Sequence, residues 1–99
     1  MSLSTHVLDT ANGRPAAGVA IELRRGDEVV ATAVTDADGR ASFGDVGAGA
    51  FELSFAIGDY FGSREFLDRV PVRFSMADGA HYHVPLLVSP WAYSTYRGS

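Results

Sequence analysis

Three histidines are the residues of this chain best suited to proton transfer near neutral pH. The sequence contains no cysteine, which excludes a thiolate nucleophile and a cysteine-ligated metal. Histidine has an unperturbed pKa of about 6.5, so His6, His81 and His83 are the candidate general acids or bases. A strand would present His81 and His83 on one face and Tyr82 and Val84 on the other. Spacing alone favours exposed structural histidines over an active site.

Two metal sites can be read into this sequence, and neither is specific. The three histidines fit a zinc site if both strand imidazoles face one metal. Asp36-x-Asp38-Gly39 resembles the start of a calcium loop. Aligning its glycine with that of the loop puts Val34 where the first oxygen ligand belongs, so calcium binding is not supported.

Arg40 is suited to stabilise a developing negative charge, because a guanidinium stays charged and offers several donors in one plane. It follows Asp38-Gly39, which is typical of a hairpin turn, and precedes a short predicted strand from Ala41 to Phe43. Turn position alone favours an arginine in water, so an oxyanion clamp is a hypothesis.

The run Tyr96-Arg97-Gly98-Ser99 follows a predicted strand directly, with no polar tail. Glycine lets the backbone turn into a tight space, and Ser99 would carry both a hydroxyl and a free carboxylate. Such a run could line a site, whereas chain ends usually fray.

Period-two alternation of apolar side chains predicts an all-β fold. It recurs in segments 19–24, 51–56, 70–76 and 81–88, separated by turn signals at the short spacing of β-sandwiches. We count seven or eight strands. Pro71 and Pro85 favour edge positions or strand ends. The one helical candidate, 57–66, contains Gly58 and Gly62, so only one or two turns are expected.

Size and charge exclude several classes of function. One compact domain, residues 1–99, is expected, with no linker or repeat. A formal net charge of -4 with scattered charges provides no basic stripe for nucleic acid. There is no signal-like N-terminus, and no apolar stretch approaches the roughly 20 residues that span a bilayer. We expect a cytoplasmic protein with no nucleic-acid or membrane partner.

Six sequence blocks and the closing run resemble the signature of the hydroxyisourate hydrolases of the transthyretin-like family. The blocks are Leu3–Asp9, Asn12–Ala16, Asp38–Arg40, Gly58–Phe61, His81–Leu87 and Ser89–Pro90. Transthyretin shares the sandwich and a similar Leu-Leu-x-Ser-Pro block. The histidines, the arginine and the terminal Tyr-Arg-Gly-Ser distinguish the hydrolases from it.

The resemblance implies a two-sheet sandwich of about eight strands with one short helix, assembled as a homotetramer with active sites at the dimer–dimer interface. It implies hydrolysis of 5-hydroxyisourate to 5-hydroxy-2-oxo-4-ureido-2,5-dihydro-1H-imidazole-5-carboxylate, in the degradation of urate to allantoin. No metal and no cofactor are implied. The expected catalytic residues are His6, Arg40 and His83, and the expected substrate-binding residues are His6, Arg40, Tyr96 and Ser99.

A division of labour follows from these expected roles. A neutral His6 or His83 would accept a proton from water as it attacks a ring carbonyl, and Arg40 would stabilise the oxyanion. The sequence leaves open which histidine is the base. His81 is a weaker candidate, expected to support the catalytic residues rather than to contact the substrate. Two alternatives are a non-catalytic transthyretin-like protein that binds a small ligand, since the fold does not decide function, and a zinc hydrolase.

Overall fold

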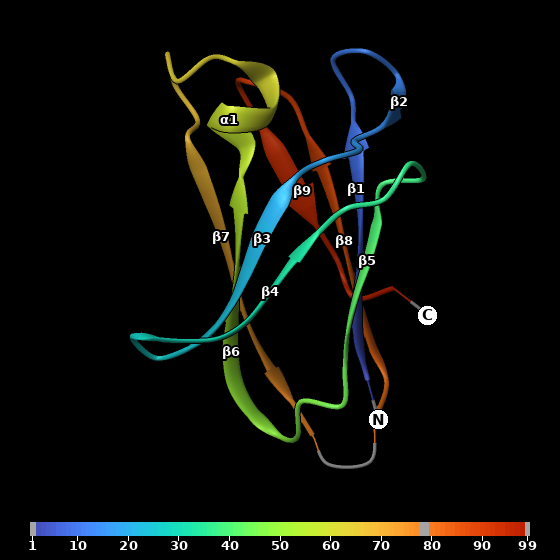
Figure 1. Cartoon of the computed structure of the whole chain (residues 1–99), viewed down its shortest axis with the longest axis vertical. Coiled ribbons are helices and arrows are strands. Elements are labelled where there is room, and N and C mark those ends of the chain that lie inside the picture. The colour runs from blue at the N-terminus through green and yellow to red at the C-terminus, as the bar shows by residue number, and fades with distance from the viewer. Residues whose placement is uncertain (1, 78–79, 99) are drawn as a thin grey trace.

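Two β-sheets face one another, and one short helix lies at an end of the sandwich (Figure 1). This computed structural model describes residues 2–77 and 80–98. The first sheet contains β1 (Leu3–Asp9), β2 (Arg14–Pro15), β5 (Arg40–Gly44), β8 (Tyr82–Val88) and β9 (Tyr93–Thr95). The second contains β4 (Glu28–Val34), β3 (Ala20–Arg25), β6 (Gly49–Ala56) and β7 (Arg69–Met76), in that spatial order. The predicted all-β sandwich is confirmed.

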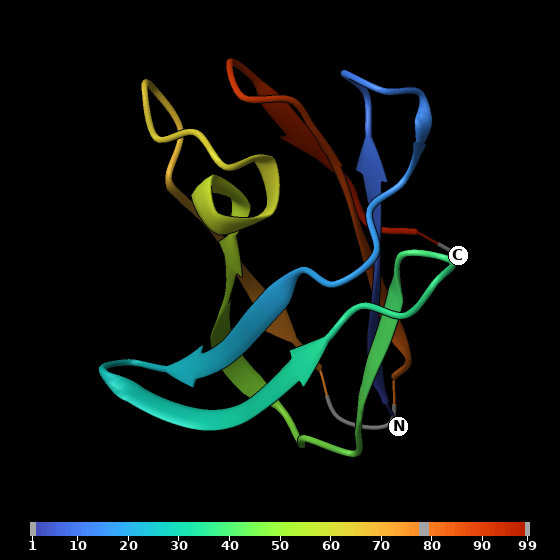
Figure 2. The same cartoon turned by 45° about the horizontal axis from the view of Figure 1, so that its top comes forward.

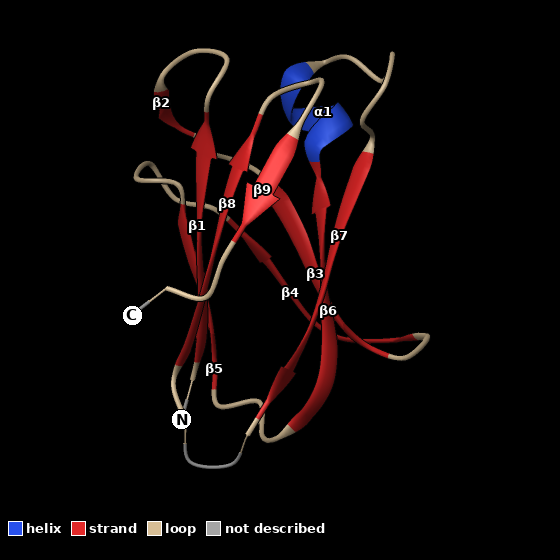
Figure 3. Ribbon diagram, turned by 180° about the vertical axis from the view of Figure 1, so that it is seen from behind, coloured by secondary structure: helices blue, strands red, loops and turns tan. Residues whose placement is uncertain are grey.

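Strand β1 is the centre of the first sheet (Figure 3). On one side it pairs in parallel with β8 over its whole length, from Leu3 opposite Tyr82 to Asp9 opposite Val88. On the other side it pairs antiparallel with β5 along its first half and with β2 at its end. Each residue of β1 therefore has its cross-strand neighbours fixed by register.

The two sheets face one another (Figure 2), and buried apolar side chains from both form the core between them. Side chains of β1 alternate between buried and half-buried, and Leu3 and Val7 are fully buried. Leu53 and Phe55 of β6 are fully buried in the same core. Each such side chain contributes roughly 1.5–3 kcal/mol to stability. Since β1 has one face held in the core, its alternate residues are fixed on the outer face.

The two strand prolines behave differently. Pro71 lies in β7, at the edge of the second sheet, as predicted. Pro85 lies within β8, between β1 and β9, so its prediction as an edge or end residue is wrong. The β8–β9 ladder begins only at Leu86, and the Thr95 hydroxyl donates to the Pro85 carbonyl (2.6 Å). Because the β8–β9 ladder begins only after Pro85, the missing N–H of the proline is tolerated inside this strand.

The helix is shorter than the predicted segment 57–66. Helix α1 spans Ile57–Phe61 and ends at Gly62, whose φ of 68° is left-handed. Gly58 is required for space, because a Cβ there would overlap the side chain of Asp68. No helix within 2–77 and 80–98 is long and apolar enough to cross a membrane. The same ranges contain nine strands, whereas the sequence predicted seven or eight. Two of the nine are very short, because β2 has only two residues and β9 has three.

One buried carboxylate fastens α1 to the first sheet. Asp9 is 1% exposed and accepts hydrogen bonds from the Tyr60 hydroxyl (2.8 Å) and from the backbone and side chain of Asn12 (2.9 and 2.8 Å). Burial alone would raise the pKa of Asp9, but these hydrogen bonds outweigh it and lower the pKa. The carboxylate is therefore charged and fully engaged at neutral pH.

Candidate active site

The predicted chemical residues lie on the outer face of the first sheet, on three adjoining strands. His6 of β1 lies directly opposite Arg40 of β5. Ser4, two residues earlier on the same face, lies opposite His83 of β8. Residues opposite one another on adjacent strands have Cβ atoms about 4.5–5.5 Å apart. Sheet register therefore brings together three residues that are far apart in sequence.

An open groove of about 410 Å³ lies on this face. It is lined by Ser4, Thr5, Asp36, Arg40, Ala41, Ser42, His81 and His83. Two of the three expected catalytic residues line it, while His6 lies beside Arg40 outside the lining. His81, the weaker sequence candidate, is part of the wall. The groove thus combines a guanidinium with two imidazoles.

His83 is held on two sides. Its Nδ1 lies 2.8 Å from the Ser4 hydroxyl oxygen. Gly98 lies so close to the ring that a Cβ there would come within 2.6 Å of Cδ2. Burial lowers the pKa of His83 below its ordinary value of 6.5, and the positive charge of Arg40 lowers it further. At neutral pH this imidazole is neutral and can accept a proton.

His6 has one ring nitrogen committed to the protein. Its Nε2 lies 2.9 Å from the backbone carbonyl of Asp38. A carbonyl only accepts, so Nε2 carries the proton and Nδ1 is the nitrogen left for another partner. The hydrogen bond fixes the tautomer of neutral His6.

The loop before β5 is organised by one carboxylate. Asp36 Oδ1 accepts hydrogen bonds from the backbone N–H groups of Asp38 (2.9 Å) and Arg40 (3.0 Å). The Arg40 amide is the main cause of the lowered pKa of Asp36. Gly39 has a φ of 77°, and a Cβ there would come within 2.5 Å of the Val7 carbonyl. The turn therefore fixes the backbone position of Arg40 and the position of the Asp38 carbonyl that accepts a hydrogen bond from His6.

The closing run reaches the site through Gly98 rather than through its tyrosine. The Gly98 N–H donates to the His83 carbonyl (2.7 Å), so the chain after β9 returns to β8 (Figure 3). Tyr96 is 58% exposed and lines a different groove with Tyr82 and Arg97. The Arg97 guanidinium lies 4.0 Å from the Tyr82 ring centroid. Ser99, expected to bind substrate, lies outside the described residues.

Sequence reasoning gave Ser4 no role in the site and considered Asp36 only as part of an unsupported calcium loop. Both are small polar residues of a kind common on exposed strands and turns. Only the parallel register of β1 with β8 places Ser4 against His83. Asp36 could have been found from Asp-x-x-Gly before an arginine, a pattern in which a carboxylate closes a turn on backbone amides.

The described part of the chain offers no group of three histidine, aspartate or glutamate side chains placed to hold a metal ion. The zinc interpretation therefore finds no support in the geometry of these residues.

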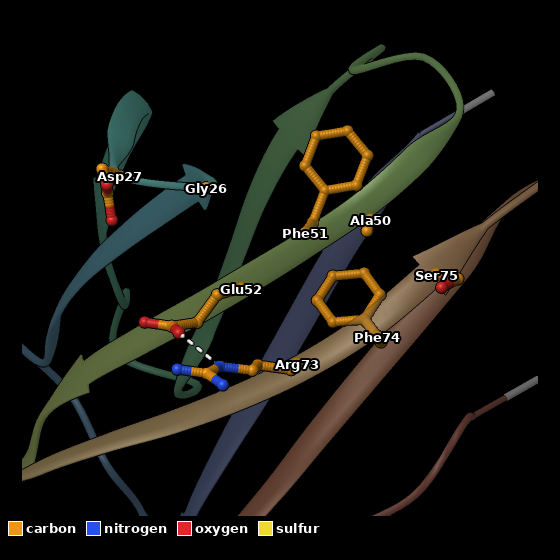
Figure 4. Close-up of a pocket in the computed structure, with 8 residues that line it drawn as sticks. All are labelled: Gly26, Asp27, Ala50, Phe51, Glu52, Arg73, Phe74 and Ser75. Atoms are coloured by element: carbon orange, nitrogen blue, oxygen red, sulfur yellow. Dashed lines mark hydrogen bonds and ion pairs between the residues drawn. The ribbon is translucent and has the colours of Figure 1, made fainter.

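A second open cavity of similar size, about 430 Å³, lies on the other sheet (Figure 4). The rings of Phe51 and Phe74 lie beside one another there, and Arg73 pairs with Glu52 at 3.0 Å. Its lining contains no histidine, and its arginine is neutralised by an adjacent carboxylate. Of these two cavities, the groove on the first sheet is the one that combines a cation with a neutral proton acceptor.

Comparisons with known proteins give matches over nearly the whole chain. The HIUase/Transthyretin family matches residues 3–98. A 5-hydroxyisourate hydrolase of Mesorhizobium japonicum is 50% identical over 113 aligned positions, covering 98% of this chain and 91% of that protein. The structure of Klebsiella pneumoniae 5-hydroxyisourate hydrolase superposes with a TM-score of 0.90 at 39% identity, covering 100% of both chains. Sea bream transthyretin in complex with thyroxine gives a TM-score of 0.84 at 30% identity, covering 97% of this chain and 93% of that one.

Proposed function

The chain belongs to the HIUase/Transthyretin family, and we propose that it hydrolyses 5-hydroxyisourate in urate degradation. The product would be 5-hydroxy-2-oxo-4-ureido-2,5-dihydro-1H-imidazole-5-carboxylate, on the route to allantoin. The observation that supports this best is the groove in which His83, with its lowered pKa, lies near the cationic Arg40. A neutral base and a fixed cation in one groove are what the addition of water to a carbonyl requires.

His83 would act as the general base. A water molecule attacks a ring carbonyl carbon, a C–O bond forms, and the proton of the water passes to Nε2 of His83. The tetrahedral intermediate then collapses with cleavage of the ring C–N bond, and the departing nitrogen takes the proton back from the imidazolium. Such positioned proton transfer typically contributes about 10² to 10⁴ in rate.

Arg40 would stabilise the oxyanion that develops on the carbonyl oxygen. Its backbone is anchored by Asp36 and by the pairing of β5 with β1, so the guanidinium starts from a fixed position. Loss of one such donor costs about 2.7–4 kcal/mol in a well-studied enzyme. Arg40 should therefore matter as much as the base.

His6 would hold the substrate beside Arg40. Because its Nε2–H is given to the Asp38 carbonyl, its Nδ1 can accept a hydrogen bond from an N–H of the substrate ring. The family resemblance also gives substrate contacts to Tyr96 and Ser99. Tyr96 lies two residues before Gly98, which packs on His83, so both residues would contact the substrate from the end of the chain.

The active form would be a cytoplasmic homotetramer with its sites at the dimer–dimer interface. One chain leaves the groove open to water, whereas a closed site strengthens electrostatic stabilisation. Trp91, Tyr93 and Tyr96 are 59%, 42% and 58% exposed, and such large aromatic side chains favour subunit contact. Light scattering of the purified protein tests this proposal, and a fully active monomer would refute it.

Loss of freshly generated 5-hydroxyisourate absorbance, measured against its spontaneous hydrolysis, tests the proposed activity. The protein should accelerate the decay, and activity should persist after treatment with a chelator. The alternative is a ligand-binding protein, favoured by the likeness to transthyretin in complex with thyroxine. That alternative predicts saturable binding of a small aromatic ligand with decay at the spontaneous rate.

A further inference from the structure

Two serine–histidine pairs follow one another, one in the parallel ladder of β1 and β8 and one between the residues just before these strands. Ser4 Oγ lies 2.8 Å from Nδ1 of His83, and Ser2 Oγ lies 2.5 Å from Nδ1 of His81. In both pairs the serine lies beside the same ring nitrogen. The outer pair is exposed, whereas the inner pair is part-buried and lines the groove with Arg40. The inner serine is therefore in a position to control the chemistry of His83.

We propose that Ser4 is a positioning residue that accepts a hydrogen bond from Nδ1–H of His83 and thereby keeps Nε2 unprotonated as the base. The assignment of this catalytic role rests on the proposed hydrolase function. The tautomer itself is a property of the free protein and can be measured without substrate.

The charge around His83 favours this direction of the hydrogen bond. A serine hydroxyl can donate or accept, so the 2.8 Å separation alone permits both tautomers. Arg40 lies in the same groove, and its positive charge acts on His83. The Ser4 hydroxyl beside Nδ1 can accept a hydrogen bond from an N–H there. Within the described residues no such acceptor is bonded to Nε2, where an N–H would meet only the unfavourable field of Arg40. The proton therefore belongs on Nδ1, beside the neutral hydroxyl.

Packing on the opposite edge of the ring opposes a flip that would exchange Nδ1 with Cδ2 and Nε2 with Cε1. Gly98 lies so close to this edge that a Cβ there would come within 2.6 Å of Cδ2 and 3.3 Å of Cγ of His83. Its N–H is also bound to the carbonyl of the same histidine. A rotation that swapped Nδ1 with Cδ2 would push the ring into this contact. Ser4 and Gly98 thus hold the ring from two sides.

Removal of the hydroxyl should release the proton to either nitrogen. The fraction of His83 that carries it on Nε2 cannot act as a base from that atom. Since one hydrogen bond makes a small net contribution in water, Ser4→Ala should lower kcat about threefold to tenfold and leave KM unchanged. Ser4→Thr keeps a hydroxyl and suits a strand, so it should restore most of the rate.

Nitrogen NMR of the His83 ring at about pH 8, where the imidazole is neutral, tests the tautomer directly. In the wild type, Nε2 should show the shift of an unprotonated nitrogen and Nδ1 that of a protonated one. Ser4→Ala should move both shifts toward a tautomer mixture, and Ser4→Thr should restore them. Ser2→Ala, which removes the matching hydroxyl at His81, should leave the His83 shifts and kcat as in the wild type.

A protonated Nε2 in the wild type, or unchanged shifts and kcat in Ser4→Ala, would overturn the proposal. If the shifts behave as expected but the wild type does not accelerate hydroxyisourate decay, the tautomer assignment stands and the hydrolase proposal fails. The two results are therefore distinguishable.

Discussion

Substitution of Gly98 by alanine should damage catalysis while leaving the fold intact. A Cβ at this position would come within 2.6 Å of Cδ2 of His83, and ordinary van der Waals contact begins at 3.4 Å. The ring or the tail must therefore shift by about 0.8 Å. Misplacement of a catalytic group by about 1 Å can cost 10²-fold in rate, so we expect kcat to fall about 10- to 100-fold.

The melting temperature of Gly98→Ala should stay within about 4 °C of the wild type, since the residue lies near the chain end and is outside the left-handed region. Gly13→Ala is the reciprocal control. Gly13 has a φ of 66°, and a Cβ there would have no other atom within 4 Å, so this variant should lose about 1 kcal/mol of stability and no activity. Hydroxyisourate decay and thermal unfolding of both variants give the answer. A fully active Gly98→Ala protein would refute the claim that the tail positions His83.

Three further outcomes are expected. The pKa of His83 is lowered below its ordinary value of 6.5, so its imidazole is neutral at pH 7. We therefore expect kcat/KM to be flat from about pH 7 to 8 and to fall only below about pH 6.5. A fall in kcat/KM centred above pH 7 would exclude His83 as the base. Tyr60→Phe removes a hydrogen bond to the buried Asp9 carboxylate and should lower the free energy of unfolding by about 1.5–3 kcal/mol in denaturant titration; no change would show that the contact does not contribute. Gly39→Ala combines a left-handed φ with a clash at Val7, so it should lose at least about 2 kcal/mol by the same titration, more than Gly13→Ala.

The sequence was enough to predict the sandwich because burial on one face imposes alternation. The segments 51–56 and 70–76 form strands, and so does 81–88 apart from its first residue. The prediction missed β2, which is only two residues long and has no periodicity to detect. It placed Pro85 at an edge because a missing N–H usually excludes a strand interior, and it could not know that the neighbouring ladder starts one residue later.

The site was predictable only in part. Residue chemistry gave the histidines and Arg40 only as candidates, and the family resemblance selected His6, Arg40 and His83. The groove lining contains Arg40 and His83 but not His6. The contribution of Ser4 depends on a parallel register between strands about 80 residues apart in sequence, which local patterns do not encode. The same limit applies to Gly98, whose role is a contact with His83 rather than a backbone conformation. Sequence reasoning expected Tyr96 in the pocket wall, and the structure places it along a neighbouring groove.

The most direct test of the central claim is the decay rate of 5-hydroxyisourate with the wild type, His83→Ala, Arg40→Gln and Arg73→Gln. Arg73 is the matched control, because it lies on the other sheet in an ion pair with Glu52 (Figure 4). We expect rapid decay with the wild type and Arg73→Gln, and a loss of about 100-fold or more in each of the other two variants. Decay at the spontaneous rate with the wild type, or at the wild-type rate with His83→Ala and Arg40→Gln, would contradict the account.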